Sequence, residues 1–336
     1  MESNTNMIGF VPCSSWSSAT STNSRAKACS NNKLVNITKT KTNVKSTVVM
    51  LGNRDELGRV MVATPFGIIR RDPDTLPPMV SKAAEMSAND FTDQTRLREL
   101  ELKLQENRSD KKLSALQELC FFPPDQALPL FAKTLDTSND ELARSQSVFG
   151  CSLFFDNPQQ EAATMSYETV VKALLNDSSP TVRSSAAGAL GYVKTGKSQT
   201  VKLLARQLLE DDDWLTKLCL SVSLGMLGDP TAVDILLPEL KKYNPAILND
   251  DTLILQGIIG ALGQLKAVSA LDEFQRWVNN PDRFLRTQLA ESLYNFEDPR
   301  ALSMLNILAN DNEESVKRQA RMSIEFLQER SGGKQV

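Results

Sequence analysis

The sequence contains no histidine. Histidine is the commonest general base near neutral pH and the commonest metal ligand in proteins. Its absence excludes Ser/His and Cys/His nucleophilic catalysis and HExxH metal chemistry as they are usually built. Paired carboxylates, a glycine-rich phosphate loop and a nucleophile elbow are also missing from the sequence. We therefore predict no catalytic residue and no metal site, and we favour a binding protein over an enzyme.

Cysteines, aromatic residues and long apolar runs are scarce. Beyond residue 50 the cysteines are Cys120, Cys151 and Cys219, which lie far apart and form no CxxC pair, so they do not indicate a disulfide framework. Each lies in a helical apolar pattern, where a thiol is typically a small buried side chain. No stretch of about 18 consecutive apolar residues occurs, so we predict no transmembrane span, and peripheral association with a thylakoid surface stays open.

Acidic residues are nearly absent from residues 1–50, which contain Glu2 alone against six basic residues. The same stretch is rich in Ser, Thr and Asn and cannot bury a core. A composition rich in hydroxyl residues and poor in acids is typical of an organelle transit peptide, and the single arginine beside five lysines favours a plastid. We predict a transit peptide over residues 1–50 and a chloroplast stromal protein; a plain disordered tail is the alternative.

The rest of the chain has an excess of negative charge. Without residues 1–50 it carries 32 basic and 40 acidic residues, a net charge of −8. Nucleic-acid binding requires a cationic face that displaces phosphate counterions, and no basic run interleaved with aromatics is present. We predict a protein partner and no nucleic acid.

A repeat of 31 to 39 residues runs through the last two thirds of the chain. Its anchor positions are Leu119, Cys151, Leu190, Leu224, Leu262, Leu293 and Ile324. Apolar or small residues stand four before and three after each anchor, which is the spacing of one buried helical stripe. Each frame therefore predicts a helix, which we call the second helix of its repeat.

Two further columns accompany the anchors. The residue just before the anchor is small in six of seven frames, Glu118 being the exception, which allows close helix stacking. Thirteen residues before the anchor stand Glu106, Ser138, Asp177, Asp211, Asn249, Asn280 and Asp311. Six of these seven are good N-cap residues, and Pro281 directly follows one of them as a favoured first helical residue.

A basic column follows six residues after these predicted caps. It consists of Lys112, Arg144, Arg183, Lys217, Arg286 and Lys317, with Leu255 in the remaining frame. We interpret it as a structural ladder, in which each cation bridges to capping groups of its own or the next repeat. A row of cations for an anionic ligand is the alternative.

Shorter amphipathic segments between the second helices predict the first helices of the pairs. They cover residues 125–135, 167–175, 200–209, 232–243, 270–278 and 301–309. The result is an all-α fold, an α-solenoid of HEAT-like (armadillo-like) repeats over residues 94–330. It contains six helix pairs after an unpaired helix at 110–122 and a further helix at 94–107. The second helices are expected to line the concave side, and residues 331–336 to form a disordered tail.

Residues 51–93 lie outside the repeats, and their prolines forbid a long helix. We predict an extended arm with short apolar runs. As a docking peptide for a partner it would use Phe66, Ile68, Ile69, Arg70 and Arg71; alternatively the arm lies on its own solenoid.

Three segments carry a resemblance to a known family. PTVRSSAAGALGYV, DDWLTKLCLSVSLGMLGDPTAVDILLPEL and FLRTQLAESLYNFEDPRALSML resemble the HEAT-like repeats of the phycobilisome lyase superfamily, in particular the cyanobacterial phycobilisome-degradation proteins of the NblB type. The resemblance covers about residues 113–327 and implies handling of bilin chromophores on phycobiliproteins, or an adaptor role in the turnover and acclimation of pigment complexes. The sequence departs from deoxyhypusine hydroxylase, another HEAT-type family, whose His-Glu metal motifs it lacks.

Three functions follow as alternatives. The first is a non-catalytic plastid adaptor that binds a phycobiliprotein or a chlorophyll-binding protein across its concave face. The second is a bilin lyase or lyase subunit, in which propionates of a bound tetrapyrrole would meet Arg144, Arg183 or Arg286. The third is an assembly chaperone for another plastid complex. The candidate partner-binding residues are Gln146, Ser185, Trp214, Phe284, Gln288 and Gln319.

Overall fold

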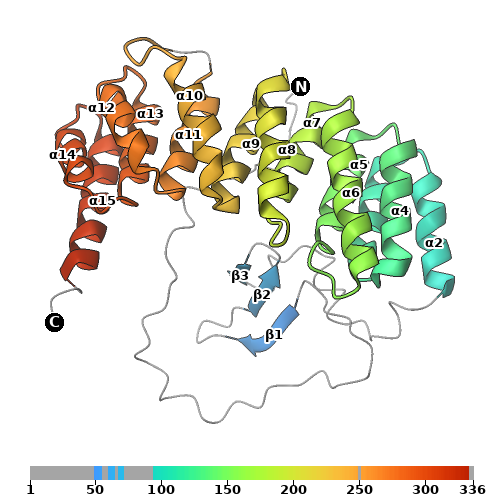
Figure 1. Ribbon diagram of the computed structural model, residues 1–336. Helices are drawn as coiled ribbons and strands as arrows, with labels where there is room; N and C mark the ends of the chain where they lie inside the picture. Colours follow the sequence, from blue (N-terminus) through green and yellow to red (C-terminus); the bar gives the residue numbers. More distant parts are fainter. Residues whose placement is uncertain (1–48, 55–59, 65–66, 72–93, 249–250, 333–336) are drawn as a thin grey trace, which may run out of the picture. The chain divides into compact units, whose positions relative to one another are not determined.

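The computed structural model describes residues 49–54, 60–64, 67–71, 94–248 and 251–332. Residues 49–54, 60–64 and 67–71 form three short strands, and residues 94–248 and 251–332 form an array of helices (Figure 1). Residues 1–48 of the predicted transit peptide lie outside the described residues, as do residues 333–336 of the predicted tail.

The three strands form an antiparallel sheet in the order β1-β2-β3. They are β1 (Val49–Arg54), β2 (Val60–Thr64) and β3 (Gly67–Arg71). Thr64 pairs with Gly67 across a tight hairpin, and the pairing of β1 with β2 is irregular between Leu51 and Arg54. β2 and β3 coincide with the apolar runs of the predicted arm, but the extended-arm prediction did not include their pairing.

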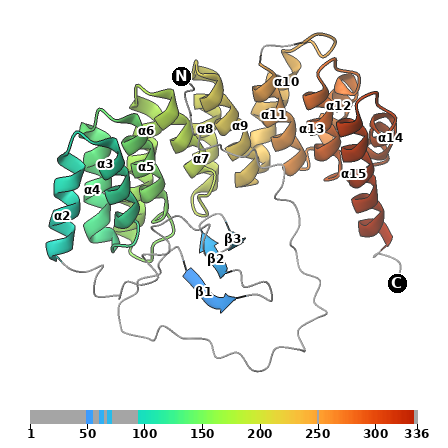
Figure 2. The same cartoon turned by 180° about the vertical axis from the view of Figure 1, so that it is seen from behind.

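The helices alternate between first and second members of antiparallel pairs, side by side in chain order (Figures 1 and 2). The first helices are α2 (Gln94–Gln105), α4 (Pro124–Thr137), α6 (Gln160–Asn176), α8 (Lys197–Glu210), α10 (Val233–Lys241), α12 (Leu271–Trp277) and α14 (Pro299–Leu308). The second helices are α3 (Ser109–Leu119), α5 (Glu141–Ser152), α7 (Pro180–Leu190), α9 (Trp214–Leu227), α11 (Thr252–Gln264), α13 (Arg283–Leu293) and α15 (Glu314–Gly332). Single 3-10 turns, Pro230–Ala232 and Val268–Ala270, lead into α10 and α12.

The anchor residues form the core that the repeat predicts. Six of the seven are fully buried, and Ile324 packs partly buried against them. Each second helix packs extensively against the next one, whereas first helices contact their neighbours less. The second helices therefore form the tightly packed inner layer and the first helices the outer layer. The prediction of an α-solenoid is confirmed.

Small residues before the anchors allow this tight packing. A Cβ added to Gly150, which precedes the anchor Cys151, would lie 2.5 Å from Cε1 of Phe131 on α4. The hydroxyl of Ser223 donates a hydrogen bond of 2.8 Å to the carbonyl of Ala187 on the preceding one, and that of Ser323 donates one of 2.8 Å to Ala290. The small column thus supplies both the space and the hydrogen bonds between neighbouring helices.

The predicted capping column was wrong by two residues. The second helices begin later, and their N-caps include Asp140, Asp213 and Asp282, whose carboxylates accept backbone N–H bonds from the first turn. The predicted caps end the preceding helix instead: Asp177 and Asp211 are the C-caps of α6 and α8. Their side chains accept the N–H two residues later, an Asx turn, which satisfies a backbone donor just as an N-cap does and therefore has a similar sequence preference.

The first pair and both ends of the array also differ from expectation. α2 and α3 pack as a further pair, so the described residues hold seven pairs and the helix predicted as unpaired has a partner. Glu118 breaks the small column because no second helix precedes α3 there; Arg96 of α2 binds it through two hydrogen bonds. Pro281 lies before α13 rather than at its first position, and α15 extends two residues past the predicted end at residue 330.

Candidate partner-binding surface

The three arginines of the basic column form bridges between consecutive repeats. Arg144 of α5 donates two hydrogen bonds, of 2.8 and 2.9 Å, to the two carboxylate oxygens of Asp177, which follows α6. Its remaining terminal nitrogen donates to the carbonyl of Ser138, six residues earlier. One guanidinium therefore binds the Asx-turn residue of the next repeat and the backbone of its own repeat.

The same geometry recurs twice. Arg183 donates to both carboxylate oxygens of Asp211 and to the carbonyl of Asp177. Arg286 donates to both carboxylate oxygens of Asp311 and to the carbonyl of Asn280. The lysines of the column make weaker contacts. Lys317 lies 3.5 Å from Glu314, Lys112 lies near Asp140, and Lys217 forms no ion pair with a described residue.

Burial makes these bridges part of the framework. The side chain of Arg183 is 17% exposed and that of Asp211 is 2% exposed. Burial alone would raise the pKa of Asp211, but hydrogen bonds from Arg183 and from the backbone N–H of Asp213 outweigh it, and the pKa lies below its ordinary value. Because both charges are paired inside the repeat, these arginines are not available to an anionic ligand.

The surface of the inner layer is almost free of charge. In the described residues of α5, α7, α9, α11 and α13, charged side chains occur only within the first two turns of each helix, with one exception. The column two residues before the anchors lies half-buried at the centre of this surface, and it consists of Phe149, Gly188, Val222, Gly260 and Glu291. We call the surface around this column the neutral inner face.

Glu291 is the exception. It forms no hydrogen bond and no ion pair with any described residue, and burial raises the pKa of its carboxyl to about 7. Helical spacing places Gln288 on the same face of α13 as Glu291. Glu291 was not among the site residues predicted from the sequence, although the repeat shows an acid where the four preceding second helices have an uncharged residue.

The candidate residues predicted from the sequence fall into two groups. Gln146, Ser185, Gln288 and Gln319 lie on second helices and are half-buried rather than exposed. Ser185 hydrogen-bonds to the backbone of Thr181 and to the hydroxyl of Ser145 on α5, so it contributes to helix stacking. The first three of the four border the neutral inner face.

Trp214 and Phe284 lie elsewhere, at the start of α9 and α13, and are 51% and 56% exposed. The structure adds further apolar side chains at this edge of the solenoid, namely Leu253 at the start of α11 and Ile247 and Leu248 in the connection before it. Asn280 donates a hydrogen bond to Pro245, which joins this connection to the next one. We call these five apolar residues the apolar edge.

The arm residues lie partly within the described structure. Ile68, Ile69, Arg70 and Arg71 belong to β3, where Ile68 and Ile69 pair with Ala63 and Val62 of β2. Phe66 lies outside the described residues.

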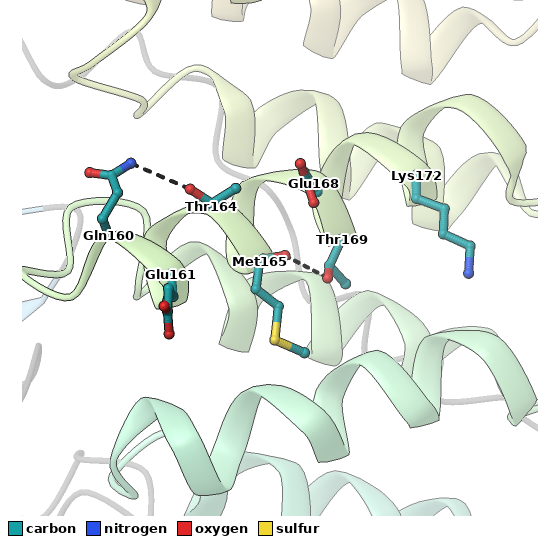
Figure 3. Close-up of a pocket in the computed structure, with 7 residues that line it drawn as sticks. All are labelled: Gln160, Glu161, Thr164, Met165, Glu168, Thr169 and Lys172. Atoms are coloured by element: carbon teal, nitrogen blue, oxygen red, sulfur yellow. Dashed lines mark hydrogen bonds between the residues drawn. The ribbon is translucent and has the colours of Figure 1, made fainter.

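A surface hollow of about 550 Å³ lies on the outer layer (Figure 3). All residues that line it belong to α6, among them Glu161, Met165 and Glu168. Figure 3 shows them along one helix, with hydrogen bonds only between Gln160 and Thr164 and from the Thr169 hydroxyl to the Met165 carbonyl. Because no second element supplies a converging group, the hollow has no features of a binding site.

The three thiols in the described part of the chain are not activated nucleophiles. Burial raises the pKa of Cys120 to about 12 and that of Cys219 to about 11, and it raises the pKa of Cys151 as well. A thiol reacts as the thiolate, so all three are unreactive near neutral pH. In the part of the chain that the structure describes, no group of three His, Cys, Asp or Glu side chains could hold a metal ion, and no helix is long and apolar enough to cross a membrane.

Stacked helix pairs joined by buried arginine–aspartate bridges define an α-solenoid protein with an extended inner face. The model of the HEAT-repeat family matches residues 167–248 and 246–325. Residues 167–325 thus consist of HEAT repeats, in agreement with the predicted fold class. We found no match among curated proteins.

Solved structures with similar architecture include natural and designed proteins. The complex of CpcE and CpcF of phycocyanin lyase from Nostoc sp. PCC7120 is 21% identical, with a TM-score of 0.45 over 60% of this chain and 76% of that one. Human deoxyhypusine hydroxylase is 16% identical, with a TM-score of 0.32 over 75% of this chain and 100% of that one. A designed armadillo repeat protein is also 16% identical, with a TM-score of 0.32 over 69% of this chain and 99% of that one. Similarities at this level say nothing about activity or partner.

Proposed function

We propose that this chain is a non-catalytic plastid adaptor, which binds a pigment–protein complex on the neutral inner face of its solenoid during assembly, acclimation or turnover. The pigment protein is a phycobiliprotein or a chlorophyll-binding protein. The chain acts in the chloroplast stroma after loss of residues 1–50, and it associates with thylakoids only through its partner.

The observation that carries this proposal is the run of half-buried positions across five successive second helices, which are uncharged in four helices and glutamate only in α13. A solvated face of a helix normally carries charged side chains, and the outer helices of this solenoid do so, as at Glu168 and Lys172. Charged residues are depleted at the centre of protein–protein interfaces, where apolar and amide groups pack against the partner. The neutral inner face has that composition.

Two features of the sequence support the choice of partner. The acid-poor first 50 residues indicate import into a plastid, and the three repeat segments resemble a superfamily that acts on phycobilisomes. Neither feature distinguishes a phycobiliprotein from a chlorophyll-binding protein.

The proposal is tested by purifying the tagged full chain from plastids, beside a Val222→Glu variant that places a charge in the neutral inner face. We expect pigment proteins to co-purify with the unsubstituted chain, and at least tenfold less of them to co-purify with the Val222→Glu variant. Recovery of unrelated soluble enzymes alone would contradict the adaptor role, and recovery of another plastid complex would favour the assembly-chaperone alternative.

If the chain is a bilin lyase, residues other than the three predicted arginines must bind the propionate groups. Arg144, Arg183 and Arg286 already bind carboxylates, so propionate groups could reach them only by breaking buried ion pairs. A bound bilin would need contacts on the neutral inner face instead. A shift of the bilin absorption band on mixing with the chain would support this alternative, and an unchanged spectrum would exclude it.

A further inference from the structure

Glu291 occupies an unusual position in the neutral inner face. It is half-buried in the last turn of α13, three residues after Gln288, so both side chains lie on the same face of the helix. The corresponding residue of α11 is Gly260, which has no side chain, and that of α15 is Met322. No described residue pairs with the carboxyl.

The elements next to α13 leave this carboxyl electrostatically isolated. α11 has no charged residue, and Arg318, Arg321 and Glu325 of α15 are exposed. Arg330 of α15 hydrogen-bonds to the carbonyl of Tyr294 and to the carboxylate of Glu297. On α13 itself the other charges are Arg283 and Arg286, near its start, where each pairs with an acid of the following repeat. α12 and α14 carry their charges on the outer layer; those with ion pairs include Glu273, Arg276 and Arg300. Burial alone raises the pKa of Glu291.

An isolated carboxylate on a neutral surface restricts what can cover it. An uncharged partner would bury either an unpaired charge or a protonated carboxyl without a hydrogen-bond partner, both of which are unfavourable, and an acidic partner or a nucleic acid would be repelled. A lysine or arginine would instead form a charge-assisted hydrogen bond in a surrounding of low polarity, where such bonds are strong. The charge pattern of this face is therefore complementary to an apolar segment with one basic residue.

We propose that Glu291 binds a single lysine or arginine side chain of the protein partner, and that the partner segment around this cation is otherwise uncharged. The inference rests on the proposed function, because it specifies the partner of the same face. It also assigns a role to a residue that no contact within the described chain explains.

Selection from a phage-displayed library of random peptides tests this inference. The immobilised targets are the full chain and its variants Glu291→Gln, Glu325→Gln and Val222→Glu, each first shown to keep the helical circular dichroism of the unsubstituted chain. Glu325→Gln removes the same charge from an exposed position of α15 and is the matched control. We expect the unsubstituted chain and the control to enrich apolar peptides with one basic residue.

Affinities then resolve the pairing. Replacing the basic residue of an enriched peptide by norleucine should weaken binding to the unsubstituted chain about tenfold and leave binding to Glu291→Gln unchanged within about twofold, as a double-mutant cycle requires. An equal preference for basic peptides on Glu291→Gln would overturn the inference. Selection of uncharged peptides by the unsubstituted chain, Glu291→Gln and Glu325→Gln alike would also overturn the inference. If Val222→Glu then failed to bind these peptides, the proposed function would still stand. If no enriched peptide responded to Val222→Glu, both proposals would fail.

Discussion

At the scale of single residues, the buried bridges explain how the repeats keep their register. Each of the three arginines binds a carboxylate that also accepts a backbone N–H at the start of the next second helix. Such a bridge fixes side chain and backbone together, and removing one partner leaves an uncompensated charge in a site of low exposure. The partners should therefore be sensitive to substitution even where the volume is conserved.

Asp211→Asn tests this argument. We expect the free energy of unfolding to fall by about 2–4 kcal/mol, because Arg183 loses its charged partner in a buried site. Urea denaturation followed by circular dichroism measures the change. Asp272→Asn is the control, since Asp272 is 85% exposed and pairs with Arg300 at the surface, where the loss should stay below about 0.5 kcal/mol. Equal losses in both variants would show that the bridges are no stronger than surface pairs.

Glu291→Gln should stabilise the chain in a pH-dependent way. The pKa of the folded state, about 7, lies above the ordinary 4.5, so the unfolded state loses its proton first and the free energy of unfolding falls as pH rises between these values. The Glu291→Gln variant has no carboxyl at this position, so its free energy of unfolding does not fall in this way as pH rises. With allowance for partial exposure, we expect it to be more stable than the unsubstituted chain by about 1–2 kcal/mol near pH 8 and by almost nothing near pH 5. A difference independent of pH would mean that the carboxyl is not perturbed.

The bridges show how far the sequence determines the site. Every arginine of the basic column precedes a repeat whose Asx-turn residue is aspartate, as in Arg183 and Asp211. Where the column has lysine or leucine, the next repeat has Ser138, Asn249 or Asn280. The pairing was therefore predictable, and the ladder interpretation agrees with it. The partial burial of Gln146 and Ser185 was not predictable, because it depends on the spacing between neighbouring helices.

At the scale of helices, the repeat predicted which segments are helical better than where they begin. The apolar columns define helices from α3 to α15 because burial follows the helical period. The starts were placed two residues early because aspartate and asparagine are favoured both in Asx turns and at N-caps. The weak pairing signals of β1 to β3 were missed, because short strands beside prolines do not differ from an extended arm in composition.

Glycine substitutions test the close stacking of the second helices. A methyl group at Gly225 would approach Cα of Ala261 to 2.8 Å, so Gly225→Ala should lower the free energy of unfolding by about 1–3 kcal/mol. Gly188 lies in a helix with no atom of a neighbouring element within 4 Å of an added Cβ. Gly188→Ala should therefore raise the free energy of unfolding by about 0.5–1 kcal/mol. Thermal denaturation of both variants checks the opposite signs. A destabilised Gly188→Ala would show that space is also restricted on the inner face.

At the scale of the whole solenoid, charge is distributed by layer. Among the described residues, the outer helices carry charges of both signs and the acidic excess lies in the connections, while the middle second helices present uncharged groups. A repeat array in which each unit contributes one or two such positions creates an extended surface without a deep pocket. That surface suits a protein partner better than a small molecule.

Such a contact predicts weak salt dependence. With Glu291 as the only charge in the face, partner binding should change less than about threefold between 50 mM and 500 mM salt, because screening acts on exposed charges separated by water. Elution of the partner complex from the tagged chain over a salt gradient measures this. Release at moderate salt would point to the charged connections rather than to the neutral inner face.

Site-specific photo-crosslinking tests the central claim, that the partner lies on the neutral inner face, most directly. Benzoylphenylalanine is placed at Val222 on α9 or, as the control, at Leu302, which is 39% exposed on α14 of the outer layer. After irradiation of intact plastids, we expect a crosslink from position 222 to a pigment-binding protein and none from position 302. A crosslink from 302 to that protein with none from 222 would contradict the account.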